Sequence, residues 1–459
     1  MSTPSRFRPF TFGVTRATVR DASGTTYLQA EQTLAPYATR MTDRLVHWAS
    51  TTPDRAVYAR RAPVEGGAGG DWQHLTFKEA LEAARCIGQA LLDRGLNAER
   101  PLAILSENSL EHAMLALGAM YAGVPYCAVS PPYSLISQDF DKLRHVLDTL
   151  TPGLVYASDW ARYGRAIEAV VPASTEVVVN SIATNSGAVN ANGTRALTTF
   201  DQIRSTPATP AVDAAMQATG PDTIVKFLFT SGSTKLPKAV INTQRMICAN
   251  QVMLRETLAF LKDEPPVIVD WLPWNHTFGG NHNIGLTLFN GGSMYLDEGK
   301  PMPGGIEETV RNLHEISPTV YFNVPKGYES LLPYLRDDGA LRAKFFGRLH
   351  AMFFSGAALS PFVWNSLDEL AVQEKGYRVP MLTGLGATET SPFFMSVNPF
   401  TSRSGHVGLP VLGNEAKLVP ANGKLEVRAR GPNVTPGYWR QACRLQWQAN
   451  PPNIARPAH

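Results

Sequence analysis

A stretch of hydroxyl and cationic side chains follows an apolar run near the middle of the chain. The run ends at Phe229, and the next residues are Thr230, Ser231, Gly232, Ser233, Thr234 and Lys235, with a second lysine at Lys238. Hydroxyls and turn amides donate hydrogen bonds to phosphate oxygens, and lysine adds positive charge. The stretch lacks the spacing of the G-x-x-x-x-G-K-[ST] phosphate loop. It predicts an anion site, although a plain Ser/Gly-rich turn with solvated lysines has the same composition.

Two loops of small residues follow apolar runs further along the chain. The first is Ser355-Gly356-Ala357, where small side chains let a flat ring lie against the backbone. The second ends in Glu389 and contains Gly384, Leu385, Gly386, Ala387 and Thr388. Glycines permit close approach, and Glu389 beside a hydroxyl suits a Mg²⁺–phosphate site. Each loop alone is equally typical of a simple turn, and together they favour a nucleotide site.

An aromatic-rich segment with a single histidine lies between the hydroxyl-rich loop and these two loops. It contains Trp271, Trp274, His276 and Phe278, followed by Gly279-Gly280. A lone histidine is usually structural, and paired tryptophans usually belong to a core. Beside a nucleotide site, the same side chains suit a pocket for an organic acid.

Apolar runs and amphipathic stretches alternate along most of the chain. A strand at Leu102–Leu105 precedes a predicted helix at Ser109–Tyr121, which Gly123 ends. Similar reasoning predicts a strand at Thr223–Phe229 and a helix at Asn281–Phe289. This alternation predicts an α/β fold of parallel sheets with helices on both faces. Ligands of such sheets bind at the carboxyl ends of the strands, so we expect the three loops to meet there.

The two ends of the chain differ from this pattern. Glu415–Val419 and Leu425–Ala429 flank Asn422-Gly423, which predicts a β-hairpin. The first residues are rich in arginine with no acid before Asp21, which weakly resembles a transit peptide. We expect instead an extended arm that lies on the surface.

Length and composition limit the class of protein. The 459 residues are 44% hydrophobic and 18% charged, which predicts a soluble globular protein with more than one core. The net charge of +3 argues against nucleic acid as a partner. The four cysteines show no C-x-x-C spacing, which suits a reducing compartment, and no apolar stretch is long enough to span a bilayer. We therefore expect a cytoplasmic protein with no membrane partner.

Several motifs together resemble the adenylate-forming superfamily, which includes the acyl-CoA synthetases. They are FTSGSTKLPKAV, LPWNHTFGG, SGAALS, GLGATET, GHVGLPVLG and GPNVTPGYW, in that superfamily's order and spacing over roughly residues 40 to 440. The arm and the wording LPWNHTFGGNHN look most like the feruloyl-CoA synthetases. The resemblance implies the large N-terminal domain of these enzymes, with parallel sheets and helices in a five-layered arrangement and a small distorted β-barrel near its end.

The resemblance also implies a division of the chain. It predicts an arm at 1–40, an AMP-binding adenylation domain at 41–440 and an atypical tail at 441–459. Because the tail lacks the family's ribose-binding aspartate, we expect the small C-terminal domain to be missing. Lys235 and Ala239 replace two glycines of the family's phosphate loop. Leu385 stands where an aromatic residue usually faces the adenine.

The implied activity is that of an AMP-forming acid–CoA ligase. It would use ATP, Mg²⁺ and coenzyme A to activate an aromatic carboxylic acid, with ferulate or another hydroxycinnamate as the expected substrate. A carboxylate with a pKa of about 4 to 5 is ionised at neutral pH, so its attack on the α-phosphate needs no general base. Without the C-terminal domain, we expect this chain to be limited to binding or to the first half-reaction.

The resemblance assigns roles to individual residues. The catalytic residues would be Lys238, His276, Thr388 and Glu389, and Glu389 would hold Mg²⁺. The ATP site would comprise Thr230, Ser231, Gly232, Ser233, Thr234, Lys238, Ser355, Gly356, Ala357, Gly384, Leu385, Gly386, Ala387 and Thr388. The acid pocket would comprise Trp274, His276, Phe278, Val324, Gly327, Tyr328 and Gly384.

Other functions remain open at this point. The chain would also suit a non-catalytic remnant that binds a nucleotide or an acid, or a relative of the fatty-acyl-CoA synthetases. An unrelated ATP-dependent phosphotransferase is disfavoured because the sequence lacks a Walker-type loop. The expected partners are a small carboxylic acid, ATP and CoA, and we allow for a homodimer.

Overall fold

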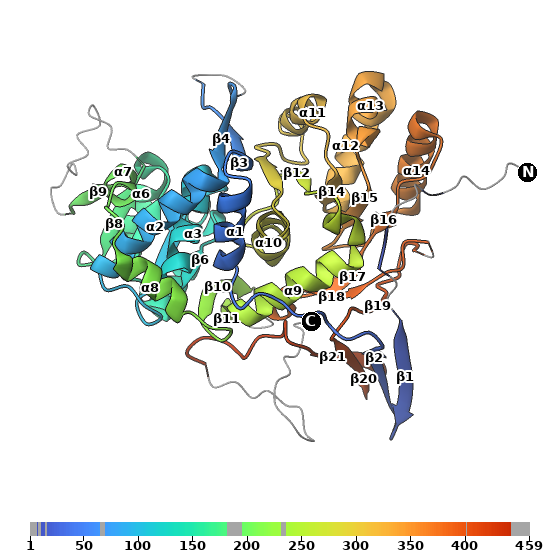
Figure 1. Ribbon diagram of the computed structural model, residues 1–459, viewed down its shortest axis with the longest axis horizontal. Helices are drawn as coiled ribbons and strands as arrows, with labels where there is room; N and C mark the ends of the chain where they lie inside the picture. Colours follow the sequence, from blue (N-terminus) through green and yellow to red (C-terminus); the bar gives the residue numbers. More distant parts are fainter. Residues whose placement is uncertain are drawn as a thin grey trace, which may run out of the picture.

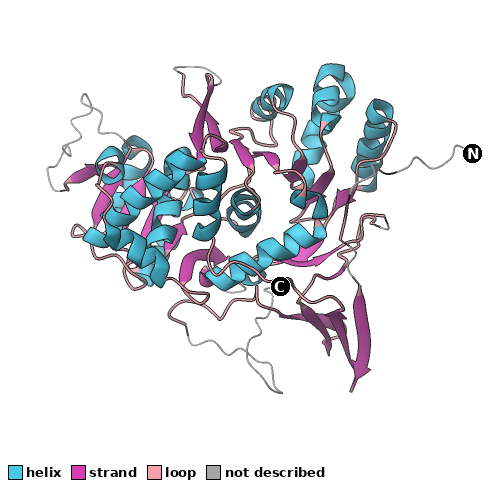
Figure 2. Ribbon diagram, in the orientation of Figure 1, coloured by secondary structure: helices cyan, strands magenta, loops and turns pink. Residues whose placement is uncertain are grey.

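The computed structural model describes residues 7, 11–13, 16–64, 69–180, 195–230, 236–400 and 402–441. Two helix-covered groups of mainly parallel strands lie side by side, and a strand-rich part lies at the lower right in the view of Figure 1. The colouring by secondary structure in Figure 2 shows helices on the outer sides of the strands and between them. The predicted α/β fold is confirmed.

The larger sheet has the strand order β11-β10-β6-β5-β7-β8-β9. Its strands are parallel except for the antiparallel pair β10–β11. Helices cover both faces of this sheet, so its inner strands are apolar throughout instead of alternating with polar residues. The bounds are β5 (Leu102–Leu105), β6 (Tyr126–Ala128), β7 (Leu154–Ala157), β8 (Glu176–Val179), β9 (Leu197–Thr199), β10 (Ile224–Thr230) and β11 (Lys238–Thr243).

Two smaller groups of strands lie next to each other on the other side. One has the order β12-β13-β3-β4 and the other β14-β15-β16. The Thr319 N–H donates to the Val267 carbonyl at 2.9 Å, which places β14 beside β12. The bounds are β3 (Ala56–Arg61), β4 (Trp72–Thr76), β12 (Val267–Asp270), β13 (Ser293–Leu296), β14 (Val320–Asn323), β15 (Ala351–Phe354) and β16 (Met381–Leu382).

Helices form three layers around and between these sheets. One apolar cluster includes Tyr126 of the larger sheet, Met294 of the smaller one and the buried faces of α2 and α3, so these helices lie between the sheets. The middle helices are α1 (Thr42–Thr51), α2 (Phe77–Asp93), α3 (Leu110–Ala122), α7 (Phe200–Arg204), α8 (Pro210–Ala218), α9 (Gln244–Thr257) and α10 (Ile284–Phe289). The outer helices are α4 (Pro132–Leu135), α5 (Asp141–Leu150), α6 (Trp160–Val170), α11 (Ile306–Glu315), α12 (Pro325–Asp337), α13 (Gly339–Gly347) and α14 (Pro361–Lys375).

Local signals fix the ends of α3 where the sequence predicts them. The Ser109 hydroxyl accepts a hydrogen bond from the His112 N–H at 3.1 Å, which satisfies one of the free donors of the first turn. Gly123 ends the helix with a φ of 69°, a conformation that costs glycine little. The middle layer is therefore built from helices whose boundaries the sequence encodes.

The strand-rich part pairs a segment near the start of the chain with one near its end. Its main sheet has the order β1-β2-β20-β21, with β1 (Ala17–Ala22), β2 (Thr25–Ala30), β20 (Glu415–Ala421) and β21 (Lys424–Arg430). Asn422 and Gly423 have φ angles of 50° and 75°, so the predicted hairpin forms around a turn with two positive φ values. Residues 17–30 differ from the expected extended arm because they form a hairpin that pairs with β20. The division into 1–40, 41–440 and 441–459 stays a prediction, and residues 442–459 lie outside the described residues.

The predicted helix at Asn281–Phe289 begins earlier and in another form. A π-helix, η2 (Phe278–Asn283), leads directly into α10. Apolar periodicity does not distinguish a π-turn from an α-turn, which is why the sequence misplaced this boundary. Across the described ranges, no helix combines the length and apolarity that crossing a bilayer requires.

Candidate active site

A cavity of about 260 Å³ lies where the end of β10, the loop after β15 and the turn around β17 (Gly384–Gly386) approach one another. The three loops singled out in the sequence all contribute to it. Its lining residues are Thr230, His276, Thr277, Phe278, His282, Phe353, Ser355, Gly356, Gly384, Leu385, Gly386, Ala387, Thr388, Glu389, Pro392, Phe393 and Met395.

A second cavity of about 210 Å³ adjoins the first. The two share Thr230, His276 and Thr388, so these three side chains lie at the boundary between them. The second cavity extends to Ser130 and Tyr133, after β6 of the larger sheet. A ligand with two chemically different parts therefore has one space for each, with hydroxyls and an imidazole at the junction.

The polar side of the site brings a cation close to a carboxylate. Lys238 begins β11 and pairs in register with Thr230 at the end of β10. The Lys238 ammonium lies 5.2 Å from the centroid of the Tyr438 ring, and the Tyr438 hydroxyl donates to Glu389 Oε1 at 3.0 Å. Tyr438 was absent from the predicted site, although it lies in the motif GPNVTPGYW. The predicted residues Ser231, Gly232, Ser233 and Thr234 lie outside the described residues.

The turn that carries Glu389 is packed too closely for larger side chains. A Cβ at Gly384 would lie 2.1 Å from the Met395 carbonyl oxygen of β18 (Phe393–Ser396), and one at Gly386 would lie 1.9 Å from that of Pro392. The Thr435 N–H donates to the Glu389 carbonyl at 2.8 Å. Glu389 is 2% exposed, so the turn holds a buried carboxylate at the cavity.

His276 lines both cavities as a neutral imidazole. Its Nδ1 accepts a hydrogen bond from the Phe278 N–H at 3.3 Å, so the proton of the neutral ring is on Nε2. Burial lowers the pKa of His276 from its ordinary value. A neutral imidazole with Nε2–H suits donation to a carboxylate or phosphate oxygen.

The apolar side of the cavity is a wall of aromatic rings. Phe278 and His282 come from η2, Phe353 from β15 and Phe393 from β18. The His282 ring lies 5.3 Å from Phe278, 5.5 Å from Phe353 and 6.1 Å from Phe393, measured between centroids. Sequence reasoning missed Thr277, His282, Phe353, Pro392, Phe393 and Met395. Of these, Thr277 and His282 lie in a motif that had been singled out, LPWNHTFGGNHN.

The predicted acid-pocket residues divide into two groups. The lining of the cavity includes His276, Phe278 and Gly384 but not Trp274, Val324, Gly327 or Tyr328. It also leaves out Lys238 and Ala357 of the predicted ATP site. Trp274 is 2% exposed, and its ring meets His112 edge to face at 5.0 Å in the middle layer. The Tyr328 hydroxyl donates to the Tyr321 carbonyl at 2.8 Å. An aromatic residue next to a motif can belong to the core as easily as to a pocket, so sequence alone did not separate the two groups.

The chain matches a known protein family over most of its length. A family model described as "AMP-binding enzyme" matches residues 45–439. The chain belongs to the AMP-binding enzyme family. It is 27% identical over 399 residues to a long-chain-fatty-acid–CoA ligase of Salmonella typhimurium, a match covering 80% of this chain and 66% of that ligase. It is 28% identical over 221 residues to an anthranilate–CoA ligase of Pseudomonas aeruginosa, covering 46% of this chain and 39% of that ligase.

A solved structure supports the fold of this AMP-binding enzyme. A long-chain-fatty-acid–CoA ligase of Archaeoglobus fulgidus superposes with a TM-score of 0.69 at 16% identity. The superposition covers 89% of this chain and 78% of that one. The chain spans only 39% to 66% of the length of the two curated relatives above. The fold is therefore shared with acyl-CoA ligases, while substrates and activity need their own argument.

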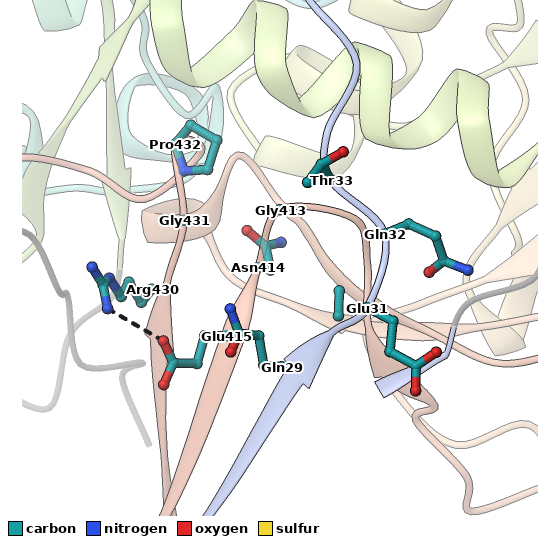
Figure 3. A pocket seen from close by; sticks show the side chains of 11 residues that line it. Gln29, Glu31, Gln32, Thr33, Gly413, Asn414, Glu415, Arg430, Gly431 and Pro432 are labelled. Atoms are coloured by element: carbon teal, nitrogen blue, oxygen red, sulfur yellow. Dashed lines mark hydrogen bonds and ion pairs between the residues drawn. The ribbon is translucent and has the colours of Figure 1, made fainter. Parts of the chain in front are cut away.

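A larger cavity of about 530 Å³ lies elsewhere in this AMP-binding enzyme, between the end of β2 and the strands β20 and β21. Figure 3 shows it from close by, with Arg430 and Glu415 joined across the two strands by an ion pair of 3.3 Å. Its walls are mostly amide, carboxylate and backbone groups from residues 29–33, 413–415 and 430–432. It contains none of the predicted site residues, so volume alone does not identify the active site.

Proposed function

We propose that this chain binds ATP and an aromatic carboxylic acid and joins them as an acyl-adenylate, for transfer to coenzyme A. Ferulate or another hydroxycinnamate is the proposed acid. The observation that carries the proposal is one cavity that combines Thr230, Thr388 and Glu389 with a wall of phenylalanine rings. Such a cavity suits a ligand with a charged reacting end and a flat apolar body.

The proposed reaction forms one bond and breaks one. A carboxylate oxygen of the acid attacks the α-phosphorus of ATP, and the bond from that phosphorus to the pyrophosphate oxygen breaks. The Thr230 and Thr388 hydroxyls and the Lys238 ammonium would donate to phosphate oxygens. His276 Nε2–H would orient the carboxylate. Positioning and charge neutralisation of this kind are what phosphoryl chemistry requires of a protein.

Glu389 is the residue that would hold Mg²⁺. No group of three or more His, Cys, Asp or Glu side chains arranged for a metal occurs in the part of the chain that the structure describes. One carboxylate nevertheless fits, because Mg²⁺ is usually bound by one or two carboxylates together with substrate phosphates and water. When bound, Mg²⁺ neutralises charge on the phosphates. The use of Mg²⁺ and CoA, the cytoplasmic location and a homodimer remain parts of this proposal.

A fatty acid is the second candidate substrate. Two of the similar proteins are long-chain-fatty-acid ligases, which supports it, whereas the anthranilate ligase acts on an aromatic acid by its name. The small volume and the ring-lined wall of the cavity favour a short flat acid over a long flexible chain. We therefore propose an aromatic acid.

Pyrophosphate exchange into ATP tests the proposal directly. The purified chain is incubated with Mg²⁺, ATP, labelled pyrophosphate and one of ferulate, 4-coumarate, benzoate, anthranilate or palmitate. We expect exchange to be faster with the hydroxycinnamates than with palmitate. Glu389→Gln should reduce it by about 100-fold or more, as expected for loss of a group that stabilises transferring charge. Glu307→Gln is the control, since Glu307 accepts its hydrogen bond from Tyr334 at an exposed site.

Three outcomes would contradict the proposal in different ways. Exchange fastest with palmitate would replace the aromatic acid by a fatty acid. Binding of Mg-ATP without exchange for any acid would indicate a non-catalytic binder. Release of ADP in place of AMP would indicate a phosphotransferase.

A further inference from the structure

A segment near the end of the chain, residues 433–439, crosses from the turn after β17 to the larger sheet. The Ile241 N–H of β11 donates to the Gly437 carbonyl at 3.1 Å, and the Trp439 N–H donates to the Ala239 carbonyl at 2.8 Å. These hydrogen bonds place this crossing segment antiparallel to β11, along the edge of the sheet that β11 forms. The crossing segment therefore links two elements on which residues of the candidate site lie.

Thr435 makes the link through two different groups. Its N–H donates to the Glu389 carbonyl at 2.8 Å, and its hydroxyl donates to the Ile241 carbonyl of β11 at 2.7 Å. The other acceptor within reach of the hydroxyl, the Gly437 carbonyl at 2.9 Å, is itself bonded to β11. Thr435 is 0% exposed, and hydrogen bonds away from water are stronger than exposed ones. One buried residue thus joins the backbone of the Glu389 turn to that of β11.

The two elements that Thr435 joins each carry a charged group of the site. Lys238 begins β11, three residues before Ile241, and Glu389 lies in the turn. Tyr438 contacts both charged groups through its side chain, whereas Thr435 joins the backbones that carry them. The hydrogen bonds of Thr435 therefore determine how far β11 lies from the turn.

Thr435 itself does not belong to the wall of the site. It lines neither the 260 Å³ cavity nor the 210 Å³ cavity, so it acts on a ligand only through the groups that it holds. A displacement of about 1 Å in a reacting geometry can cost about 100-fold in rate. Glu389 is 2% exposed and has little freedom to compensate for a displaced backbone, whereas the flexible side chain of Lys238 has more. Glu389 is therefore the group that depends most on Thr435.

We propose that Thr435 is a positioning residue, which holds the Glu389 carboxylate at the separation from β11 that a bound nucleotide requires. The inference rests on the proposed function, in which Glu389 holds Mg²⁺ on the phosphates. It predicts that the Thr435 hydroxyl matters for the part of ATP binding that depends on Mg²⁺. Binding of ATP without the metal depends on Lys238 and the hydroxyls of the site, so it should change less.

Thr435→Val removes the hydroxyl and keeps the shape and the N–H of the residue. The measurement is calorimetric titration with ATP, once with Mg²⁺ and once with EDTA, and the readout is the ratio of Kd in EDTA to Kd in Mg²⁺. We expect the variant to lower this ratio by about threefold to tenfold, as expected for loss of one hydrogen bond. In pyrophosphate exchange with 4-coumarate, the Mg²⁺ concentration for half-maximal rate should rise by a similar factor. Thr435→Ser retains the hydroxyl and should restore most of the wild-type ratio.

Thr319→Val is the matched control. Thr319 is 1% exposed, and its hydroxyl accepts a hydrogen bond from the Val267 N–H at 2.9 Å, which also joins two strands. It lies at the start of β14 and lines neither cavity of the site. This variant should lower the free energy of unfolding and keep the wild-type ratio of dissociation constants. If it lowered the ratio as Thr435→Val does, the effect would be one of stability and the inference would be wrong.

The outcomes separate this inference from the proposed function. Exchange by the wild type together with equal ratios for the wild type and Thr435→Val would overturn the role of Thr435 and leave the ligase proposal intact. Absence of exchange with every acid would overturn the ligase proposal, and the titrations would still decide whether Thr435 supports Mg²⁺-dependent binding. Wild-type binding of ATP that Mg²⁺ does not strengthen would overturn the inference. If Thr435→Val does not fold, Thr435→Ala compared with Thr435→Ser differs in the hydroxyl alone and decides.

Discussion

Tyr438 contacts both Lys238 and Glu389 beside the candidate site. Its ring faces the Lys238 ammonium at 5.2 Å, and its hydroxyl donates to Glu389 Oε1 at 3.0 Å. The ring face attracts a cation, whereas the hydroxyl hydrogen-bonds a carboxylate. One side chain thus orients two groups of opposite charge that come from β11 and from the turn after β17.

Removing only the hydroxyl of Tyr438 tests this arrangement. Tyr438→Phe keeps the ring under Lys238 and frees one oxygen of Glu389. A hydrogen bond to a charged group contributes about 1.5–3 kcal/mol, so we expect pyrophosphate exchange to fall about tenfold or more. The measurement is exchange at several Mg-ATP concentrations, which separates weaker binding from slower chemistry.

Tyr334→Phe provides the control for that variant. Tyr334 also donates its hydroxyl to a glutamate, Glu307, at 2.9 Å, but on the exposed surface between α12 and α11. The same atom is removed, and exchange should stay at the wild-type rate. Equal rates for the two variants would show that Tyr438 does not orient Glu389 for the reaction.

At the scale of elements, the π-helix η2 connects the two halves of the fold. Lys226 of β10 donates to the Gly280 carbonyl, and Asn242 of β11 accepts from Asn281 Nδ2 at 2.8 Å. The same helix supplies Phe278 and His282 to the cavity wall. The larger sheet therefore positions the aromatic wall of the cavity through hydrogen bonds made inside the core. π-turns are frequent at functional sites, and this one places two side chains of the wall.

Gly280→Ala should disturb this helix. The added Cβ would lie 2.1 Å from the Trp274 carbonyl oxygen, a backbone atom that cannot rotate away. We expect the free energy of unfolding to fall by about 1–3 kcal/mol, the usual cost of overpacking, and acid binding to weaken. Urea unfolding and calorimetric titration with 4-coumarate measure the two effects.

Gly220→Ala shows what the same substitution does without crowding. A Cβ at Gly220 would have no atom within 4 Å. Stability and acid binding should match the wild type. A Gly280→Ala variant that unfolds and binds acid like Gly220→Ala would mean that the close approach to Trp274 does not hold η2 in place.

Lys226 of β10, which bonds to η2, makes the free energy of unfolding depend on pH. Its ammonium is 3% exposed, and burial lowers the pKa to about 7. An unfolded lysine keeps its proton to about pH 10.4, so between these values the unfolded state binds more protons than the folded state. Folding stability attributable to Lys226 therefore rises with pH across this range.

Comparison with Lys226→Met isolates this contribution. The unfolding free energy of the wild type minus that of the variant should increase from pH 7 to pH 9, by at most about 1.36 kcal/mol per pH unit. Urea unfolding at three pH values measures it. Lys142→Met, which removes an exposed lysine whose ammonium lies 5.6 Å from the Tyr133 ring, serves as the control. A difference that stays constant or decreases would contradict the buried-lysine interpretation.

The same elements show how far the sequence predicts the molecule. Strand and helix order followed from apolar patterning, and the ends of α3 followed from Ser109 and Gly123, because these signals are local. The wall residues Phe353 and Phe393 were not predicted, since a buried phenylalanine in a strand has the same pattern whether it faces a core or a cavity. The π-form of η2 and the contact of Tyr438 with Glu389 depend on segments far apart in the chain. Such long-range contacts leave no local signal.

At the scale of the whole molecule, the candidate site is assembled from segments that lie far apart in the chain. Thr230 belongs to the larger sheet, His276 to the segment after β12, Ser355 to the loop after β15 and Glu389 to the turn after β17. No single element contains enough of these groups to bind a nucleotide. A nucleotide bound there would contact all of them only in the folded state, so binding should stabilise the whole fold.

Thermal protection by Mg-ATP tests this assembly without requiring turnover. A ligand that binds only the folded state stabilises it by RT ln(1 + [L]/Kd), which is about 2.7 kcal/mol at a hundredfold excess over Kd. We expect a rise in melting temperature with Mg-ATP, a smaller rise with ATP and EDTA, and a smaller rise for Glu389→Gln than for wild type with Mg-ATP. The Glu307→Gln control should be protected like the wild type, because Glu307 lies on α11 away from both cavities. A folded chain whose melting temperature does not change with saturating Mg-ATP would rule out the nucleotide site itself. If Mg-ATP protected Glu389→Gln as well as it protects the wild type, the nucleotide site would be retained, and Glu389 would not be the metal ligand.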